Sequence, residues 1–250
     1  GITYSTAGSK TITHIVTNNF GCVTTANGTI TINTTPVANF SSTAPSCTGD
    51  SVDFLNTGTS SATFAWSFSG ATPPTSTSAS PQNVVYSTSG TKTVQLITTL
   101  GSCSDTSTQT IDIKQTPAPA YSSIAAQCEG APVTFTYTGT TGLGWTYNWD
   151  FGAGATPPNS PAQNPGSVFY TGTGIITIAL AVTNDICSQS STGTVTINQT
   201  PVANFTSTAP GCTGDSVDFL NTGTSSATFA WVLSGATPPT STSASPQNVV

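Results

Sequence analysis

Polar and apolar residues alternate along several short stretches of the chain, and this period of two predicts β-strands. In SVDFLN at residues 51–56, Val52 and Phe54 fall on the same face of the expected strand. Similar stretches lie at residues 37–42, 62–68, near Tyr86, at 91–99 and at 107–113. The polar, Pro-rich residues 71–81 are expected to form a connection, and no stretch carries a capped helical stripe. The pattern therefore predicts all-β, seven-stranded sandwiches of about 80 residues.

Long stretches of the chain repeat at wide spacing. Residues 36–85 and 201–250 pair over fifty positions and differ at only four of them. A diverged copy begins at Pro117, so the three copies start 81 and 84 residues apart. This period is too long for a solenoid coil and favours a string of small domains. Near-identity at a spacing of 165 residues indicates recent duplication of a two-domain unit.

The two ends of the chain fall at almost the same point of the repeat. GITYSTAGSKT at residues 1–11 matches VVYSTSGTKT at 84–93, and Val250 matches Val85 just before that stretch's tyrosine. We therefore expect a segment cut from a longer array of alternating A-type and B-type domains. The expected parts are the second half of a B-type repeat at 1–35, an A-type repeat at 36–116, a B-type repeat at 117–200 and the first half of an A-type repeat at 201–250.

Charged residues are scarce. The chain has nine Asp plus Glu, three Lys, no Arg and one His, which gives a formal net charge of −6. Without a cationic surface we expect no nucleic-acid binding, and without a run of 18 apolar residues we expect no membrane insertion. The 35% hydrophobic content, with four Trp and eleven Phe, favours packed cores over disorder. Six cysteines without a CxxC pair favour disulfides and an oxidising, extracellular compartment.

A spaced motif recurs in the two middle copies. W-x-F-x-G begins at Trp66, and WDFGAG begins at Trp149. Each is followed by Pro, Tyr, Gly and an alternating strand, at Pro81, Tyr86, Gly90 and Leu96 in one copy and at Pro165, Tyr170, Gly174 and Leu180 in the other. The pattern resembles the PKD domain over nearly the whole chain. The resemblance implies tandem seven-stranded Ig-like (PKD-type) β-sandwiches arranged as a head-to-tail rod.

The resemblance also bears on function. Ser67 and Val232 stand where the family pattern has Asp, which counts against the calcium binding known in some relatives. Ser/Thr-rich, Cys-bearing arrays of this kind resemble the giant cell-surface and gliding-type adhesins of Bacteroidota, which the type IX secretion system exports. Fold similarity by itself does not establish function.

The six cysteines recur at two positions of the repeat. One position is the loop between the first two strands (Cys47, Cys128, Cys212), and the other is the turn between the last two (Cys22, Cys103, Cys187). In an Ig-like sandwich these lie at opposite ends, roughly 20 Å or more apart, whereas a disulfide needs Cα atoms within about 7 Å. Abutting repeats therefore favour Cys47–Cys187, with the other four cysteines pairing to domains outside this chain. The alternative is pairing within domains, Cys47–Cys103 and Cys128–Cys187.

Catalytic residues do not cluster in the sequence. His14 is the only histidine and is expected on the surface of a strand, without a carboxylate or nucleophile partner, so we expect no enzyme and no cofactor. The paired carboxylates Asp50/Asp53 and Asp215/Asp218 are weak calcium candidates. The alternative for Asp50 is the capping of a turn.

Serines and tryptophans supply the remaining candidates. DSV at residues 50–52 and 215–217 resembles the O-glycosylation sequence of Bacteroidota, which implies sugars on Ser51 and Ser216; the alternative is a plain strand start. The tryptophans expected in cores are Trp66, Trp149 and Trp231. Trp145, at the start of a strand, is expected to pack at a domain junction or to stack on a sugar.

Low charge, cysteines and near-identical repeats favour a non-enzymatic structural segment. We expect it in a secreted bacterial cell-surface filament or giant adhesin, where it extends a binding tip. The alternative is a spacer or carbohydrate-binding module of a secreted hydrolase. The expected partners are neighbouring repeats of the same chain, with surface polysaccharide or other filament subunits as further candidates.

Overall fold

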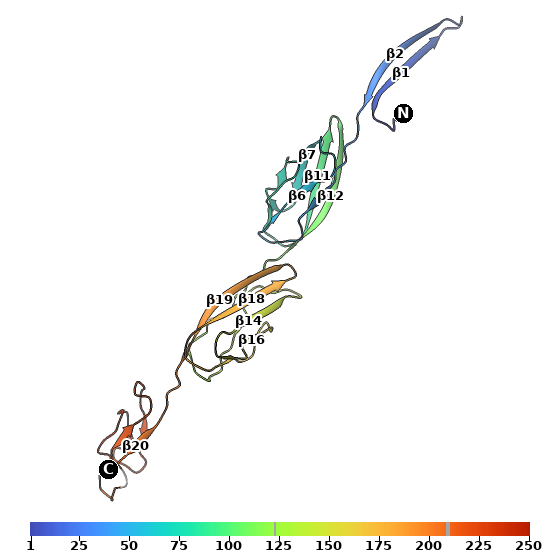
Figure 1. Ribbon diagram of the computed structural model, residues 1–250. Helices are drawn as coiled ribbons and strands as arrows, with labels where there is room; N and C mark the ends of the chain where they lie inside the picture. The colour runs from blue at the N-terminus through green and yellow to red at the C-terminus, as the bar shows by residue number, and fades with distance from the viewer. Residues whose placement is uncertain (123, 209–210) are drawn as a thin grey trace. The chain divides into compact units, whose positions relative to one another are not determined.

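The computed structural model describes residues 1–122, 124–208 and 211–250. All secondary-structure elements in these residues are β-strands, as Figure 1 shows. Packing divides the chain into two compact units. The first comprises residues 1–120, 138–148 and 180–191, and the second comprises 121–137, 149–179 and 192–250. The repeat boundaries stay a prediction from the sequence, whereas the all-β fold class is confirmed.

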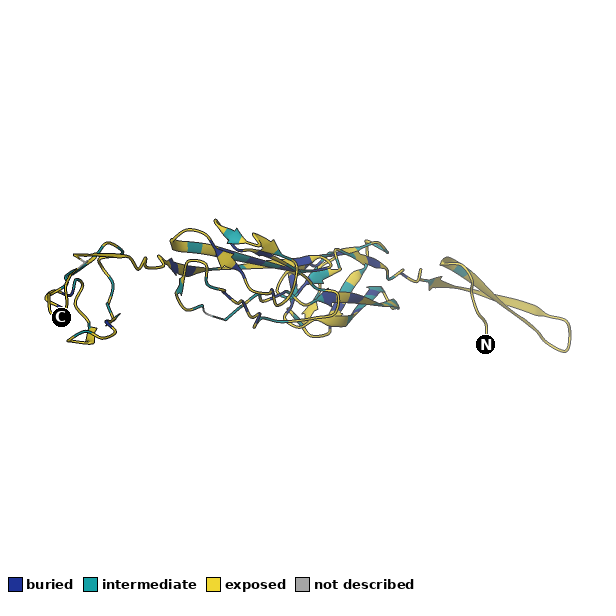
Figure 2. Ribbon diagram, turned by 90° about the horizontal axis from the view of Figure 1, so that it is seen from below, coloured by how far each residue is buried: buried dark blue, intermediate teal, exposed yellow. Residues whose placement is uncertain are grey.

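The N-terminal residues form a single antiparallel hairpin of β1 (Gly8–Thr17) and β2 (Val23–Ile32). The strands pair without interruption from Gly8–Ile32 to Thr17–Val23. Thr and Ile alternate along both strands, which suits a pleated ribbon. Almost all of these side chains are exposed (Figure 2), so the hairpin is held by backbone hydrogen bonds rather than by a core.

A β-sandwich follows. Its five-stranded sheet has the order β4-β12-β11-β7-β9, with β4 at Ser46–Cys47, β12 at Cys103–Lys114, β11 at Gly90–Leu100, β7 at Thr63–Phe68 and β9 at Thr75–Ser76. The opposite layer contains the pair β3-β6 and the sheet β5-β10-β8, with β3 at Phe40–Ser42, β6 at Phe54–Asn56, β5 at Ser51–Val52, β10 at Val84–Tyr86 and β8 at Ala71–Thr72. We call this body the first sandwich.

The core of the first sandwich lies between these two layers. Residues from both layers form one buried cluster: Phe40, Val52, Phe54, Trp66, Phe68, Val84, Tyr86, Val94, Leu96, Ile111 and Ile113. The indole of Trp66 stacks on Phe68 with ring centroids 5.8 Å apart and donates its N–H to the carbonyl of Ser78. The alternation in the sequence thus places one residue in two inside, as predicted.

Three short strands depart from the sequence expectation. β8 and β9 lie in residues 71–81, which were expected to form a connection, and β4 lies in the loop before residue 51. A strand of two residues is too short to show alternation, so the hydrophobic pattern could not reveal these three strands. The predicted strand 51–56 is divided by Asp53 into β5 and β6, which pair with different strands.

The second sandwich repeats this plan. Its five-stranded sheet has the order β13-β19-β18-β14-β16, with β13 at Gln127–Cys128, β19 at Cys187–Asn198, β18 at Gly174–Asn184, β14 at Thr146–Asp150 and β16 at Asn159–Ser160. A pair, β15 (Ala155–Thr156) and β17 (Phe169–Tyr170), and isolated bridges supply the other layer. Buried hydrophobic side chains include Val133, Phe135, Trp149, Phe151, Val168, Tyr170, Ile178, Leu180, Val195 and Ile197.

Residues 201–250 form the two strand pairs β20-β21 and β22-β23. The bounds are Phe205–Ser207 for β20, Phe219–Asn221 for β21, Trp231–Val232 for β22 and Thr240–Ser241 for β23. Their pairing follows that of β3-β6 and β7-β9 in the first sandwich, as the sequence identity requires. In the described residues, no long hairpin packs against these pairs.

Candidate functional site: the cysteine-linked junction

Cys47 and Cys187 form a disulfide although 140 positions separate them in the sequence. Cys47 belongs to β4, which pairs in parallel with the last residues of β12, so that Cys47 lies opposite Lys114. Cys187 is the first residue of β19, directly after the turn from β18. The two Cα atoms are 5.8 Å apart, within the range that a disulfide requires. Both cysteines belong to the first packing unit.

The structure therefore forms the cross-junction pair that the sequence favours. The alternative pairs Cys47–Cys103 and Cys128–Cys187 are wrong, because Cys103 and Cys128 carry free thiols. Cys47 lies beside Lys114 at one end of β12, and Cys103 begins the same strand at the other end. A 12-residue strand spans roughly 36 Å, too far for a disulfide within the sandwich. Cys22 and Cys212 are also free.

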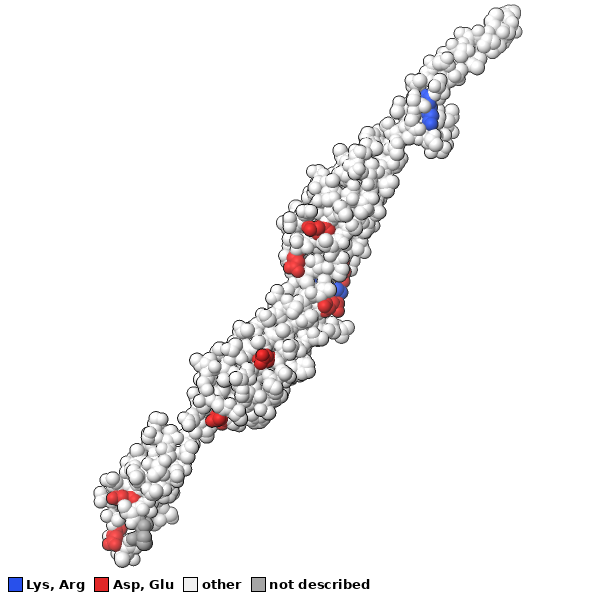
Figure 3. All heavy atoms as spheres, in the orientation of Figure 1, with Lys and Arg blue, Asp and Glu red and all other residues white. Residues whose placement is uncertain are grey.

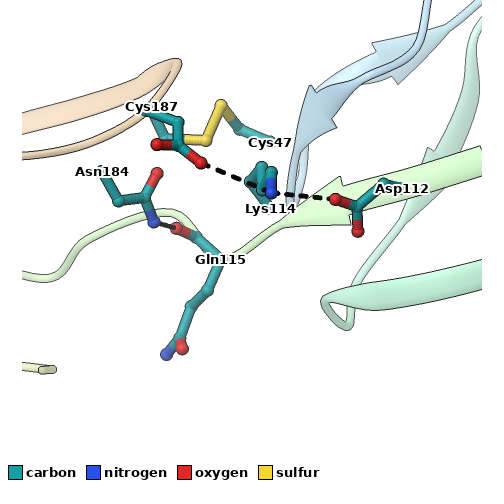
Figure 4. Close-up of polar contacts among 7 residues, drawn as sticks. Cys47, Asp112, Lys114, Gln115, Asn184 and Cys187 are labelled. Atoms are coloured by element: carbon teal, nitrogen blue, oxygen red, sulfur yellow. Dashed lines mark hydrogen bonds and ion pairs between the residues drawn. A yellow bond between two sulfur atoms is a disulfide. The ribbon is translucent and has the colours of Figure 1, made fainter. Parts of the chain in front are cut away.

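Lys114 lies next to the disulfide and contacts two carboxylates (Figure 4). Its Nζ is 2.9 Å from Asp112 Oδ2 on the same strand and 3.4 Å from Asp185 Oδ2 in the β18–β19 turn. Both carboxylates raise the pKa of Lys114 above its ordinary value, and Asp112 has the larger effect. On the face drawn in Figure 3, the other charged side chains do not meet a side chain of opposite charge, unlike Lys114. The contact ties the end of β12 to the turn that carries Cys187.

Asn184 is a further polar residue of the junction that the sequence did not single out. It is only 6% exposed, and its Nδ2 donates a hydrogen bond to the backbone carbonyl of Gln115, in the segment after β12. Its Oδ1 is buried without a hydrogen-bond partner. Because Leu100 occupies the matching position of the first sandwich, comparison of the repeats signals a difference here but not its contact.

Hydrogen bonds of Thr48 and Thr116 also hold the segment that follows β12. The amide of Thr48 donates to the Lys114 carbonyl at 2.8 Å, and the amide of Thr116 donates to Thr48 Oγ1 at 3.0 Å. Thr116 Oγ1 in turn donates to the Thr48 carbonyl at 2.7 Å. Three hydrogen bonds and the disulfide thus order both ends of a very short connecting segment. We call Cys47, Asp112, Lys114, Gln115, Asn184, Asp185 and Cys187 the junction cluster.

A recess of about 280 Å³ adjoins the junction cluster. Trp145 lies on its wall with Asp112, Lys114 and Asp185. The ring of Trp145 covers Gly142, where an added Cβ would lie 2.4 Å from Trp145 Nε1. Trp145 is half-buried, so its position fits the expected packing at a junction while leaving part of the ring accessible.

The candidate carboxylates make backbone contacts. Asp53 Oδ1 accepts a hydrogen bond from the amide of Asn83 at 2.9 Å, and Asp218 Oδ1 accepts one from Asn248 at 2.8 Å. Asp215 Oδ2 accepts from the amide of Cys212 at 2.8 Å. Within the described ranges, no three His, Cys, Asp or Glu side chains gather to hold a metal ion. Calcium binding by Asp50, Asp53, Asp215 and Asp218 stays a prediction.

The glycosylation candidates are both accessible. Ser51 is exposed on β5, and Ser216 is exposed just before the Val217–Val249 bridge. Their modification stays a prediction. His14 lies exposed in the middle of β1, on the surface of a strand as expected.

Two of the three predicted core tryptophans are buried. Trp66 is 2% exposed and Trp149 is fully buried, each inside a sandwich. Trp231 is half-buried in the described residues, and its place in a core stays a prediction. β7 lies between β11 and β9. Among the described residues β22 pairs with β23 only, so the Trp231 ring is open on the side that β11 covers at Trp66.

No protein-family model and no curated protein matches the chain. Solved structures with Ig-like or fibronectin-III domains do. Extracellular domains 3–5 of Drosophila OTK match with 10% identity and a TM-score of 0.42, covering 77% of this chain and 71% of that one. An I-band fragment of titin matches with 15% identity and a TM-score of 0.38, covering 79% and 76%. The FN1–FN3 domains of chicken CNTN1 match with 12% identity and a TM-score of 0.31, covering 86% and 84%.

The fold assignment rests on the strand pairing and the two cores, because these TM-scores are low. The chain is built from Ig-like β-sandwiches, and this fold by itself does not establish a function. A disulfide is typical of extracellular domains. A search of the described residues finds no helix long and apolar enough to cross a membrane.

Proposed function

We propose that this chain is a structural repeat segment of a secreted bacterial cell-surface filament or giant adhesin, which holds a binding tip away from the cell. The observation that carries the proposal is the Cys47–Cys187 disulfide together with the contacts of Lys114 and Asn184 around it. These bonds join the end of one sandwich to the β18–β19 turn of the next. A spacer needs such a connection more than a recognition module does.

The disulfide gives the chain a covalent route for force. A pull applied at the two ends passes from Cys47 directly to Cys187, so that the intervening residues carry no tension until the bond is reduced. Those residues include β5 to β12 and most of the second sandwich up to β18. Extension without unfolding of these elements suits a surface filament under shear.

Scarcity of charge and the PKD-like motif support the same proposal. The resemblance to Bacteroidota adhesins exported by the type IX system supplies the proposed source and route. O-linked sugars on the exposed Ser51 and Ser216 would hydrate a surface that has only three lysines and no arginine. The proposed partners are neighbouring repeats, and the proposed location is the cell surface.

Single-molecule force spectroscopy tests the covalent route. With handles at the two ends of the chain, reduction should lengthen the fully stretched protein by about 480 Å, since 140 residue positions are released at roughly 3.5 Å each. Cys187→Ser should give the long form without reductant. Cys103→Ser is the matched control, because Cys103 is already free, and it should behave as the unmodified chain. Equal lengths before and after reduction would contradict the proposal.

The recess beside Trp145 favours a second candidate, a spacer or carbohydrate-binding module of a secreted hydrolase. Trp145 is half-buried on the wall of this recess, which Asp112 and Asp185 also line, and an aromatic ring beside polar groups suits the stacking of a sugar. This candidate requires retention of the chain on an insoluble polysaccharide and loss of that retention in Trp145→Ala. Equal retention of both proteins, or of neither, rejects it.

A further inference from the structure

The recess beside the junction cluster has a net negative charge. Its volume is about 280 Å³, and its charged lining residues are Asp112, Lys114 and Asp185. Two carboxylates and one ammonium group give the walls a net charge of −1. All the lining residues belong to the first packing unit, so the recess lies within one compact body. A recess with this charge favours a cationic ligand over an anionic one.

Lys114 uses only part of the accepting capacity of the two carboxylates. Its Nζ contacts one oxygen of each, at 2.9 Å from Asp112 Oδ2 and at 3.4 Å from Asp185 Oδ2. The side chain of Asp112 is nevertheless 48% exposed and that of Asp185 is 72% exposed. An ionised carboxylate has two oxygens that each accept more than one hydrogen bond. A second ammonium group can therefore share these carboxylates with Lys114.

Asn184 adds a buried acceptor that lacks a partner. It lines the recess and is only 6% exposed. Its Nδ2 donates to the Gln115 carbonyl, whereas its Oδ1 is buried without a hydrogen-bond partner in the described part of the chain. Buried acceptors of this kind are rare in folded proteins, because they have lost water and gained nothing in exchange. A ligand that carries N–H groups into the recess supplies the missing donor.

Trp145 supplies an aromatic wall. It is half-buried, and its ring covers Gly142 at the edge of the recess. Among the aromatic side chains, tryptophan attracts a cation over its ring face most strongly. A metal ion is a poorer match, because no three His, Cys, Asp or Glu side chains gather in the described ranges. Carboxylates, an amide oxygen and an indole in one recess together suit an organic ammonium ion.

The charges of the recess are not a general feature of the repeat. Lys114 and Asn198 occupy corresponding positions, because each lies opposite a cysteine in a parallel strand pair. Two positions earlier, Asp112 corresponds to Thr196. The β11–β12 turn has no charged residue, whereas the β18–β19 turn has Asp185. The sandwich plan therefore does not require these charges, which favours a function particular to this recess.

We propose that the recess beside Trp145 binds an organic ammonium ion, either an alkylamine or the protonated amine of an amino sugar. The ammonium N–H groups donate to the carboxylates of Asp112 and Asp185 and to Asn184 Oδ1. The carbon atoms attached to the ammonium group lie against the indole of Trp145. This site goes beyond the spacer function and does not depend on it, because the disulfide takes no part in the binding.

An NMR titration of the backbone amides of the oxidised full chain tests the proposal. The probes are n-butylammonium and glucosamine at about pH 6, where both amines are protonated. Their neutral counterparts are n-butanol and N-acetylglucosamine, and sodium chloride controls for ionic strength. We expect saturable shifts at residues 142–145 and 184–185 with the ammonium probes only. Shifts with glucosamine but not with n-butylammonium also support the proposal and narrow the ligand to an amino sugar.

Two variants remove groups that contact the ligand. Asp112→Asn should weaken the binding of the ammonium probe by about tenfold, because a charged acceptor is lost. Trp145→Ala should weaken it by about fivefold, because the ring face is lost. Asp105→Asn is the matched control, since it makes the same change near the other end of β12. Asp105 accepts a hydrogen bond from the amide of Ala38, which an asparagine also accepts, so this variant should bind as the unmodified chain does.

Lys114→Met separates ligand binding from a purely structural role of the charges. Lys114 competes with the ligand for both carboxylates, so its removal should strengthen the binding of n-butylammonium or glucosamine by about threefold or more. Unchanged or weaker binding by this variant overturns the proposal. Absence of saturable shifts also overturns it, as do equal shifts with the neutral compounds or with sodium chloride. The lengthening of the chain on reduction is independent of these results, so a failure here leaves the spacer function standing.

Discussion

Residues 36–85 and 201–250 are nearly the same sequence in two different surroundings. Their aromatic rings lie at the same mutual distances, and their tryptophans donate the same hydrogen bond. Trp66 is nevertheless buried and Trp231 is half-buried. The difference is the hairpin β11–β12, which covers the first segment and has no counterpart over the second among the described residues.

This comparison separates two steps of core formation. Local pairing of short strands is enough to arrange the rings, because the paired residues of β3-β6 and of β20-β21 lie only 12–16 positions apart in the sequence. Exclusion of water needs a second layer from farther along the chain. Most of the hydrophobic stabilisation comes from that second step, since it scales with the apolar area removed from water.

The largest expected difference between the two segments concerns the tryptophans. Trp66→Ala should reduce the free energy of unfolding of the first sandwich by about 3–5 kcal/mol, because it leaves a cavity in a closed core. Trp231→Ala should cost less than about half of that, since its ring is already half in water. Hydrogen exchange followed by mass spectrometry reports each segment separately. Equal losses of protection in the two segments would show that the hairpin adds little.

A smaller difference is expected at high pH. Burial raises the pKa of Tyr86 to about 12, so the folded first sandwich keeps its phenol neutral while the unfolded chain ionises near pH 10. Stability is therefore unaffected below pH 10 and falls as the pH rises from 10 to 12, by on the order of 1–3 kcal/mol.

Ultraviolet titration and urea unfolding check this expectation. Residues 201–250 contain no tyrosine and serve as the internal control. Tyr86→Phe should remove the alkaline loss at residue 86. It should cost little at neutral pH, because the Tyr86 hydroxyl is buried without a hydrogen-bond partner. A Tyr86 phenol that ionises at pH 10 would contradict the burial described here.

The smallest effect is expected to be the same in both segments. Asp53→Ala and Asp218→Ala each remove a carboxylate that accepts a hydrogen bond from a backbone amide, at Asn83 and Asn248. Each should destabilise its own loop by about 1–2 kcal/mol, whether or not a hairpin covers the segment. Local hydrogen exchange at residues 83 and 248 measures both. An effect at Asp53 alone would mean that the loop geometry, too, depends on the complete sandwich.

The strands with several alternating residues were predictable, and the two-residue strands were not. The expected strand 91–99 is β11 at Gly90–Leu100, and the expected strand 107–113 is the second half of β12. β4 could not be predicted, because its pairing with Ile113 and Lys114 joins residues far apart in sequence. Yet β4 positions Cys47, and so it decides the disulfide.

The candidate site was predictable only in part. The cysteines recur at two positions of the repeat, and these positions lie at opposite ends of a sandwich. The sequence alone therefore favours the pair Cys47–Cys187. Asn184 escaped notice because an asparagine before a turn is common and nothing in its neighbours signals a buried contact with Gln115. Trp231 and Trp66 have the same sequence neighbours but differ in burial, because sequence neighbours do not report what covers a ring.

The sequence by itself determined the strand pattern and the repeat, since these follow from local alternation and from the spacing of similar segments. Tertiary structure decided which residues are buried and which cysteines meet. Burial and disulfide formation depend on contacts between residues that are distant in sequence, as the 140 positions between Cys47 and Cys187 illustrate. Two nearly identical segments therefore differ in burial because, among the described residues, a hairpin covers the aromatic rings of the first segment only.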